Sequence, residues 1–140
     1  MHAMTYSPRE QRGSAILEAL ISILIFSVGI LAITGLQAIS IKNVAAAKYR
    51  TDASFLANQV IGQMWADDKS NQTLKTNYET GKPKYETWSA NVIKALPGAA
   101  TTPPTIKIDA NNVATVTISW QEPGETLAHR YVALTRIDKN

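Results

Sequence analysis

The chain has 140 residues, 45% hydrophobic and 18% charged, which fits one domain with an appendage and argues against intrinsic disorder. Its net charge of +3 comes from 14 basic and 11 acidic residues, and since the basic residues form no run, a nucleic-acid-binding surface is not expected. The absence of cysteine excludes disulfides, thiolate catalysis and cysteine-ligated metal centres. The only histidines are His2 and His129, so we expect no metal ion, and we expect no cofactor.

Apolar residues are concentrated near the N-terminus. Residues 1–13 are polar, and the stretch from Ser14 to Ile41 has a single charged residue, Glu18. As a helix, its uncharged part would span roughly 35 Å, enough for a hydrocarbon core of about 30 Å. We expect one membrane-spanning helix here, with a cleaved secretory signal or a buried helix of a soluble protein as alternatives. Basic residues flank the segment on both sides, so charge counting leaves its orientation undecided.

The helix is expected to continue beyond the apolar segment. From Lys42 to Ala66 there is no proline, and apolar residues recur at spacings of three and four, as in an amphipathic helix. We therefore predict one helix from Ser14 to about Trp65, apolar all round in its first half and on one side in its second. The apolar face of the second half comprises Tyr49, Ala53, Leu56, Val60 and Met64.

Glu18 is unusual because it lies inside an apolar segment. A carboxylate in a spanning helix costs on the order of 2.5–3.5 kcal/mol at mid-bilayer, and less near an end. One explanation is that an acid near the start of a helix is favoured by the helix macrodipole. The other is that the carboxylate of Glu18 requires a positively charged partner.

The order Arg12-Gly13-Ser14, then Glu18 and a long apolar helix, resembles the class III signal of type IV prepilins. The resemblance implies that a prepilin peptidase removes a leader of residues 1–13 by cutting between Gly13 and Ser14. The new amine of Ser14 would then be N-methylated. The family glutamate is the fifth mature residue, which is the position of Glu18, whereas Ser14 departs from the more usual phenylalanine.

This processing would give Glu18 a partner. In a growing filament, the Glu18 carboxylate of an incoming subunit can pair with the Ser14 amine of a neighbour, because each charge is costly alone in low dielectric and less so when paired. Glu18 and Ser14 are therefore the expected subunit-assembly residues. Gly29 and Gly35 each lower local helicity by about 1 kcal/mol relative to alanine. They are expected either to loosen the helix during assembly, as in related pilins, or to allow close helix packing.

The stretch from Gly35 to Asp67 resembles the minor-pilin family called type IV pilus modification protein, or PilV. Further along, Trp88, a Leu-Pro-Gly turn at 96–98 and a strand at 115–120 follow in a similar order. The resemblance implies a structural subunit, not an enzyme, in a tip priming complex that supports pilus assembly, twitching motility and adhesion. Its implied partners are the prepilin peptidase, other minor and major pilins, the inner-membrane assembly platform and a tip adhesin.

The family also implies a location. The segment 14–41 would cross the inner membrane once, and residues 42–140 would form a periplasmic domain that includes the second half of the helix. After assembly the protein would lie at the pilus tip on the cell surface.

The second half of the chain predicts a small antiparallel sheet. We expect a loop from Asp67 to Lys84 and a short helix from Tyr85 to Leu96, which Pro97-Gly98 ends. Alternating apolar residues and turn signals then predict strands at 105–109, 113–121 and 129–137. The last has apolar residues on both faces, which suits a central or well-covered position. The expected fold is α+β and pilin-like, a long helix packed on a three-stranded antiparallel sheet with a short connecting helix.

The expected core combines the apolar face of the helix with the inward residues of the sheet. Trp65 is expected to join two other tryptophans there, because large aromatic side chains dominate a small core. His129 is expected to be exposed and without a role, and Asp67 and Asp68 are not expected to act in catalysis or metal binding. The core residues are Leu56, Val60, Met64, Trp88, Val116, Ile118 and Trp120.

Three hypotheses about function are open. The first is a minor pilin, and the second is a type II secretion pseudopilin, which shares the signal and a similar helix. The third is a single-pass, membrane-anchored binding module that never assembles. An enzyme has the least support, because the sequence has no phosphate-binding loop, catalytic triad order or metal-ligand spacing.

Overall fold

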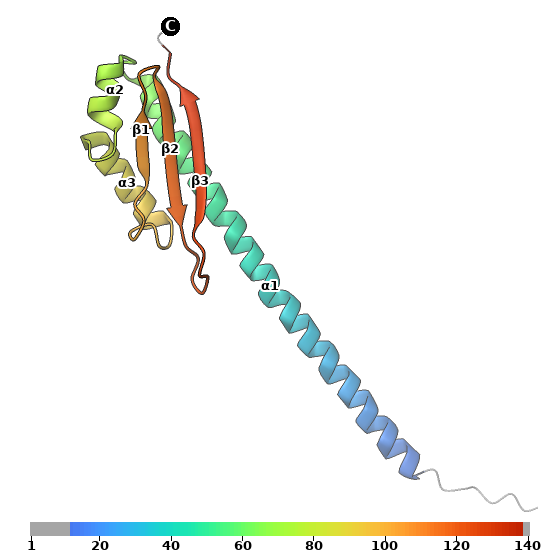
Figure 1. Cartoon of the computed structure of the whole chain (residues 1–140). Helices are drawn as coiled ribbons and strands as arrows, with labels where there is room; N and C mark the ends of the chain where they lie inside the picture. The colour runs from blue at the N-terminus through green and yellow to red at the C-terminus, as the bar shows by residue number, and fades with distance from the viewer. Residues whose placement is uncertain (1–11, 139–140) are drawn as a thin grey trace, which may run out of the picture. The chain divides into compact units, whose positions relative to one another are not determined.

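A computed structural model describes residues 12–138, with side chains from Ser14 onward. The chain divides into two units, the first ending at Asn43 and the second beginning at Val44. The elements, in chain order, are α1 (Arg12–Ala66), α2 (Asn71–Tyr78), α3 (Pro83–Ala95), β1 (Thr105–Ile108), β2 (Val113–Trp120) and β3 (His129–Arg136) (Figure 1). The expected fold class is confirmed: the protein is α+β, with a long N-terminal helix and a three-stranded antiparallel sheet.

In the first unit, α1 carries exposed apolar side chains on every side. Its most apolar window has a mean hydropathy of 2.6, so by length and composition this helix could cross a membrane. Three hydroxyl groups there donate to backbone carbonyls of the same helix, which satisfies them in an apolar environment. Their donors and acceptors, 2.7–2.9 Å apart, are Ser22 and the carbonyl of Glu18, Ser27 and that of Ile23, and Thr34 and that of Leu31.

In the second unit, the strands follow the order β1-β2-β3, and Val116 of β2 lies opposite Ile106 of β1 and Ala133 of β3. The expectation of a central or well-covered third strand is therefore wrong, since β3 is an edge strand. Val132 and Leu134 are exposed on its outer face, with Leu134 68% exposed. The apolar residues of α1 pack with the other face of the sheet. The presence of apolar residues on both faces of β3 therefore did not mean that both faces are buried.

The outer edge of β1 is covered by the segment after α2. The backbone N–H of Thr80 donates to the carbonyl of Ile106 at 3.2 Å, and the N–H of Ile106 donates to the Thr80 hydroxyl at 3.0 Å. The N–H of Ile108 donates to the Glu79 carboxylate at 3.3 Å. These bonds satisfy a strand edge that would otherwise be open to pairing.

One cluster of buried side chains joins α1, α2, α3 and the sheet. All seven residues expected in the core are buried in it. The expectation that Trp65 lies in the core is wrong. Trp65 is 39% exposed, and the Lys69 ammonium lies 5.0 Å from the centroid of its ring. It follows Met64 directly, and adjacent helical residues point about 100° apart, so Trp65 falls off the apolar face.

The segment expected to be a loop from Asp67 to Lys84 contains α2, which corrects that expectation. Ser70 caps this helix by accepting a hydrogen bond from the N–H of Thr73 at 3.3 Å. Its only buried residues are Leu74 and Tyr78, four positions apart on one face. Two apolar residues among polar neighbours are too few to reveal a helix by periodicity.

Gly98 is required by the turn that follows α3. It has a φ of 72°, and an added Cβ would lie 3.0 Å from the Cβ and 3.1 Å from the backbone nitrogen of Gln121. That backbone N–H donates to the carbonyl of Pro97 at 2.9 Å, which holds the turn against the end of β2. We expect Gly98→Ala to lower the free energy of unfolding by roughly 2–4 kcal/mol, from backbone strain and steric overlap together.

Gly81 provides the matched control for this prediction. Its φ is 83°, but an added Cβ would meet no atom within 4 Å. Gly81→Ala should therefore cost only the backbone strain, about 1–2 kcal/mol. Urea unfolding of the detergent-solubilised variants measures both losses, and equal losses would contradict the steric part of the argument.

Candidate assembly site

The candidate site lies at the beginning of α1, where three polar residues interrupt the apolar surface. Ser14, Glu18 and Ser22 follow at a spacing of four, so they share one face of the helix. With Leu17 and Ile21 they line a shallow hollow. All five are exposed, and no side chain that the structure describes pairs with the Glu18 carboxylate.

This arrangement suits the binding of a cation supplied by another molecule. The Ser22 hydroxyl donates to the backbone carbonyl of Glu18 at 2.8 Å, so it does not donate to the Glu18 carboxylate. In an apolar medium, a carboxylate without a donor is strongly disfavoured, and an ammonium group removes most of that penalty. Chemically the site can accept a charge-assisted hydrogen bond, and it offers no nucleophile paired with a base.

The expected cleavage point, between Gly13 and Ser14, falls in the first turn of α1, which begins at Arg12. Backbone N–H groups in the first turn of a helix lack intrahelical partners, so this turn is the easiest to open. Residues 1–11 of the expected leader lie outside the described residues. Cleavage and N-methylation at Ser14 therefore stay predictions.

Gly29 and Gly35 lie within the exposed, apolar part of α1. An added Cβ at either position would meet no atom within 4 Å, so the packing of a single chain does not demand glycine there. If glycine is needed, the reason lies in contacts with other molecules or in loosening of the helix. Both explanations stay predictions.

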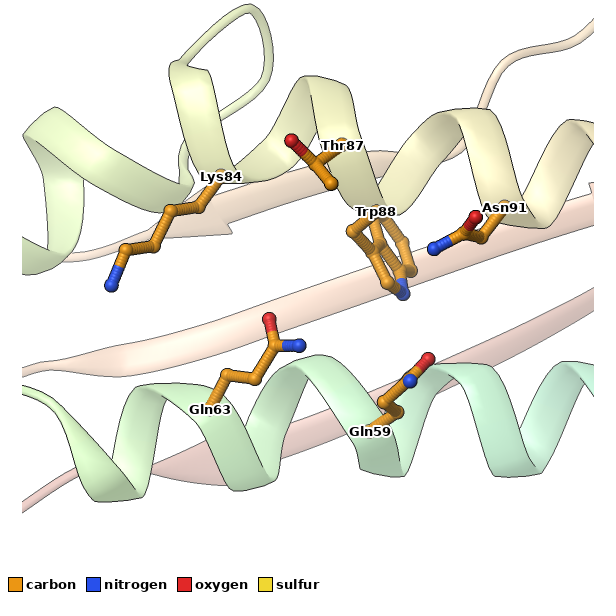
Figure 2. A pocket seen from close by; sticks show the side chains of 6 residues that line it. All are labelled: Gln59, Gln63, Lys84, Thr87, Trp88 and Asn91. Carbon is orange, nitrogen blue, oxygen red and sulfur yellow. The ribbon is translucent and has the colours of Figure 1, made fainter.

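A second hollow, of about 150 Å³, lies between α1 and α3 in the domain. Gln59 and Gln63 of α1 point toward α3, and Trp88 of α3 points toward α1 (Figure 2). The remaining lining residues are Lys84, Thr87 and Asn91. None of these six side chains ordinarily exchanges a proton near pH 7, so the hollow offers hydrogen bonds but no acid–base pair.

Asp67, just beyond α1, ties the end of this helix to α2 and α3. Its carboxylate accepts hydrogen bonds from the Lys84 ammonium and the Tyr78 hydroxyl. Lys84, and then Tyr78, hold the pKa of Asp67 below its usual value, while burial and the Asp67 charge raise the pKa of Tyr78. The adjacent Asp68 instead accepts hydrogen bonds from Ser70 and Thr73, so the two acids make separate structural contacts.

Asp67→Ala is expected to destabilise the protein at pH 7 by about 1–3 kcal/mol, because it leaves the Tyr78 hydroxyl without its acceptor. The native pKa of Asp67 is lowered, so ionised Asp67 stabilises the fold fully above its unfolded value of 3.8, and this contribution is lost as pH falls through the native pKa. Urea unfolding at several pH values should show the difference from wild type shrinking below about pH 4.

Asp52→Ala is the control for this experiment. Asp52 forms an exposed ion pair with Lys48, four residues earlier on α1, at 2.9 Å. Such an exposed pair contributes little to stability, because solvent and salt screen it. A loss at Asp67 that is no larger than the loss at Asp52, or that does not change with pH, would contradict the role of the Lys84 and Tyr78 contacts.

His129 is not the exposed residue that the sequence predicts. It is half-buried, its ring stacks on that of Trp120 at 5.6 Å between centroids, and its Nε2 lies 2.7 Å from Glu125. Trp120 and His129 are partners in the register of β2 and β3. The sequence could reveal this contact only once the register of the hairpin was known.

No protein-family model matches the chain, and neither a curated protein nor a solved structure is found to match it. Fold and site together define an α+β protein whose one long helix could cross a membrane and carries a carboxylate near its start.

Proposed function

We propose that the protein is a minor pilin of the type IV pilus. A prepilin peptidase removes residues 1–13, the new amine at Ser14 is methylated, and the chain stays in the inner membrane through residues 14–41. Residues 42–140 form the periplasmic domain. The protein then enters a tip complex with other minor pilins, which primes filament assembly and supports twitching motility and adhesion.

The observation that carries this proposal is the carboxylate of Glu18, four residues after Ser14 on an otherwise apolar, exposed helix. A simple membrane anchor gains nothing from a charge that is costly to insert. A subunit that must align its helix with a neighbour does gain, because a charge pair fixes the stagger between the helices. The Arg12-Gly13-Ser14 signal supplies the amine that completes the pair.

The α+β domain supports the same proposal. The second half of α1 contributes five residues to the core of the domain: Ala53, Leu56, Ala57, Val60 and Met64. The helix that contains the apolar segment therefore also forms part of the domain core. We propose a structural role and no enzymatic activity. Partners in this role are the major and minor pilins, the inner-membrane assembly platform and a tip adhesin.

A pseudopilin of type II secretion is the second candidate, since it would use Gly13, Ser14 and Glu18 in the same way. Deletion of the gene separates the two functions. A minor pilin predicts loss of surface pili and twitching with secretion unchanged, and co-purification with pilus components after cross-linking. Loss of protein secretion with intact pili would instead favour the pseudopilin.

A further inference from the structure

The turn between β2 and β3 gathers three side chains that can ligate a metal ion. Glu122 and Glu125 come from the turn, and His129 is the first residue of β3. Their ligand atoms all lie within 4.8 Å of one another. The Nε2 atom of His129 is 2.7 Å from Glu125 Oε2 and 3.9 Å from Glu122 Oε1, so one ring nitrogen faces both carboxylates.

Glu122 is the most informative member of this cluster. Its side chain is 5% exposed, and within residues 14–138 no hydrogen bond reaches its carboxylate. The separation of 3.9 Å from His129 is too long for a hydrogen bond. Buried carboxylates are ordinarily hydrogen-bonded, ion-paired or bound to a metal. Glu122 is within ion-pair distance of His129, and a metal ion shared by the two side chains would satisfy the carboxylate more fully.

A second polar group in the same place makes no hydrogen bond. The indole Nε1 of Trp120 is buried and makes no hydrogen bond. Trp120, Glu122 and His129 together line a hollow of about 270 Å³, whose other residues are Ala46, Ala47 and Arg50 of α1. A nine-tenths-buried acid and an unsatisfied donor therefore border one space.

We propose that Glu122, Glu125 and His129 bind a divalent metal ion of the zinc class, with a water molecule in the fourth position. In a tetrahedral site with bonds of about 2.0–2.2 Å, ligand atoms lie roughly 3.3–3.6 Å apart. The separations of 2.7 and 3.9 Å between His129 Nε2 and the two carboxylates lie on either side of that range. Metal binding would therefore open the His129–Glu125 hydrogen bond and rotate the three side chains around the ion. One imidazole and two carboxylates suit zinc, whereas calcium takes six to eight oxygen ligands.

The surroundings favour a formed site over a chance cluster. The Trp120 ring, tilted by 21° to the imidazole, holds the His129 ring in place. The turn is fixed by two hydrogen bonds, from the Glu125 N–H to the Glu122 carbonyl at 3.1 Å and from the Gln121 side chain to the Glu125 carbonyl at 2.8 Å. Arg50 is the positive group that lines the hollow, and its side chain is exposed, where solvent and salt weaken its repulsion of a cation. This proposal revises the expectation that the chain holds no metal.

The test is calorimetric titration of the full chain in detergent with zinc chloride, after removal of any purification tag. We expect one zinc ion per chain. His129→Ala should abolish saturable binding, and Glu125→Gln, which keeps the size of the side chain, should weaken it by more than about tenfold. His2→Ala is the matched control and should bind zinc as the wild type does. Substituted cobalt should give the visible absorption of a four-coordinate ion in wild type and not in His129→Ala.

Two results of the binding titration would overturn the proposal. One is that wild-type protein shows no saturable binding at millimolar zinc. The other is that His129→Ala, folded by circular dichroism, binds zinc as tightly as wild type. Thermal unfolding gives an independent readout, since zinc should raise the melting temperature of wild type and His2→Ala but not of His129→Ala at the same concentration. A rise in all three would also overturn it.

Discussion

Replacing Glu18 by alanine is expected to leave the protein in the inner membrane at normal levels and to remove it from pili. The substitution lowers the cost of inserting α1 by up to about 2.5–3.5 kcal/mol, so insertion is not impaired. It also removes the carboxylate that, in the proposed assembly, would pair with the Ser14 amine of a neighbour. Breaking a buried ion pair costs about 3–5 kcal/mol, and each 1.4 kcal/mol is a factor of ten, so incorporation should fall at least about a hundredfold.

Ser27→Ala is the control for Glu18→Ala. Ser27 lies in the same exposed apolar part of α1 but outside the hollow at its start, and its hydroxyl donates to the Ile23 carbonyl of the same helix at 2.7 Å. This variant should enter pili normally. Glu18→Gln, which keeps shape and removes charge, should behave like Glu18→Ala. Quantitative immunoblots of membranes and of sheared pili measure both pools, and normal incorporation of Glu18→Ala would refute the assembly role of this carboxylate.

The largest effect on stability is expected at Trp88. Its side chain is 2% exposed, its indole N–H donates to the carbonyl of Leu56 at 2.9 Å, and its ring lies 6.1 Å from that of Tyr85. It therefore joins α3 to α1 through both packing and a hydrogen bond. Trp88→Ala should cost about 3–5 kcal/mol, a large part of the 5–15 kcal/mol that typically stabilises a domain.

Trp65→Ala makes the same chemical change at an exposed position. Its ring contacts Lys69 and lies outside the core, so the expected loss is below about 1 kcal/mol. Urea unfolding followed by far-ultraviolet circular dichroism compares the two variants without relying on tryptophan fluorescence. Similar losses at Trp65 and Trp88 would contradict the arrangement of the core.

The parts of the fold that depend on local periodicity could be predicted from the sequence. Leu56, Val60 and Met64 are spaced for one helix face, and Val116 and Ile118 alternate as a half-buried strand requires. These patterns place residues on the core side of an element without knowledge of its neighbours.

Features that depend on neighbouring elements could not be predicted in the same way. The exposure of Leu134 depends on which face of the sheet packs with α1, because Leu134 lies on the opposite face. The sequence did not reveal α2, because only Leu74 and Tyr78 of this helix are buried in the core and its other residues are polar.

The two candidate sites differ in the same respect. Ser14 and Glu18 share a helix face by their spacing, and the resemblance to prepilins implies that they act together. Glu122, Glu125 and His129 come together only through the path of the β2–β3 turn, and their pattern resembles no metal motif. The proposed partner of Glu18 belongs to neither case, because the proposal places it on another chain.

The most direct test of the proposed function is the intact mass and N-terminal sequence of the protein isolated from membranes, with and without prepilin peptidase. A pilin-class subunit predicts a chain that begins at Ser14 and is one methyl group heavier when the peptidase is present, and that keeps residues 1–13 when it is absent. A chain that keeps residues 1–13 in both strains would contradict the prepilin signal and favour a permanently anchored binding module.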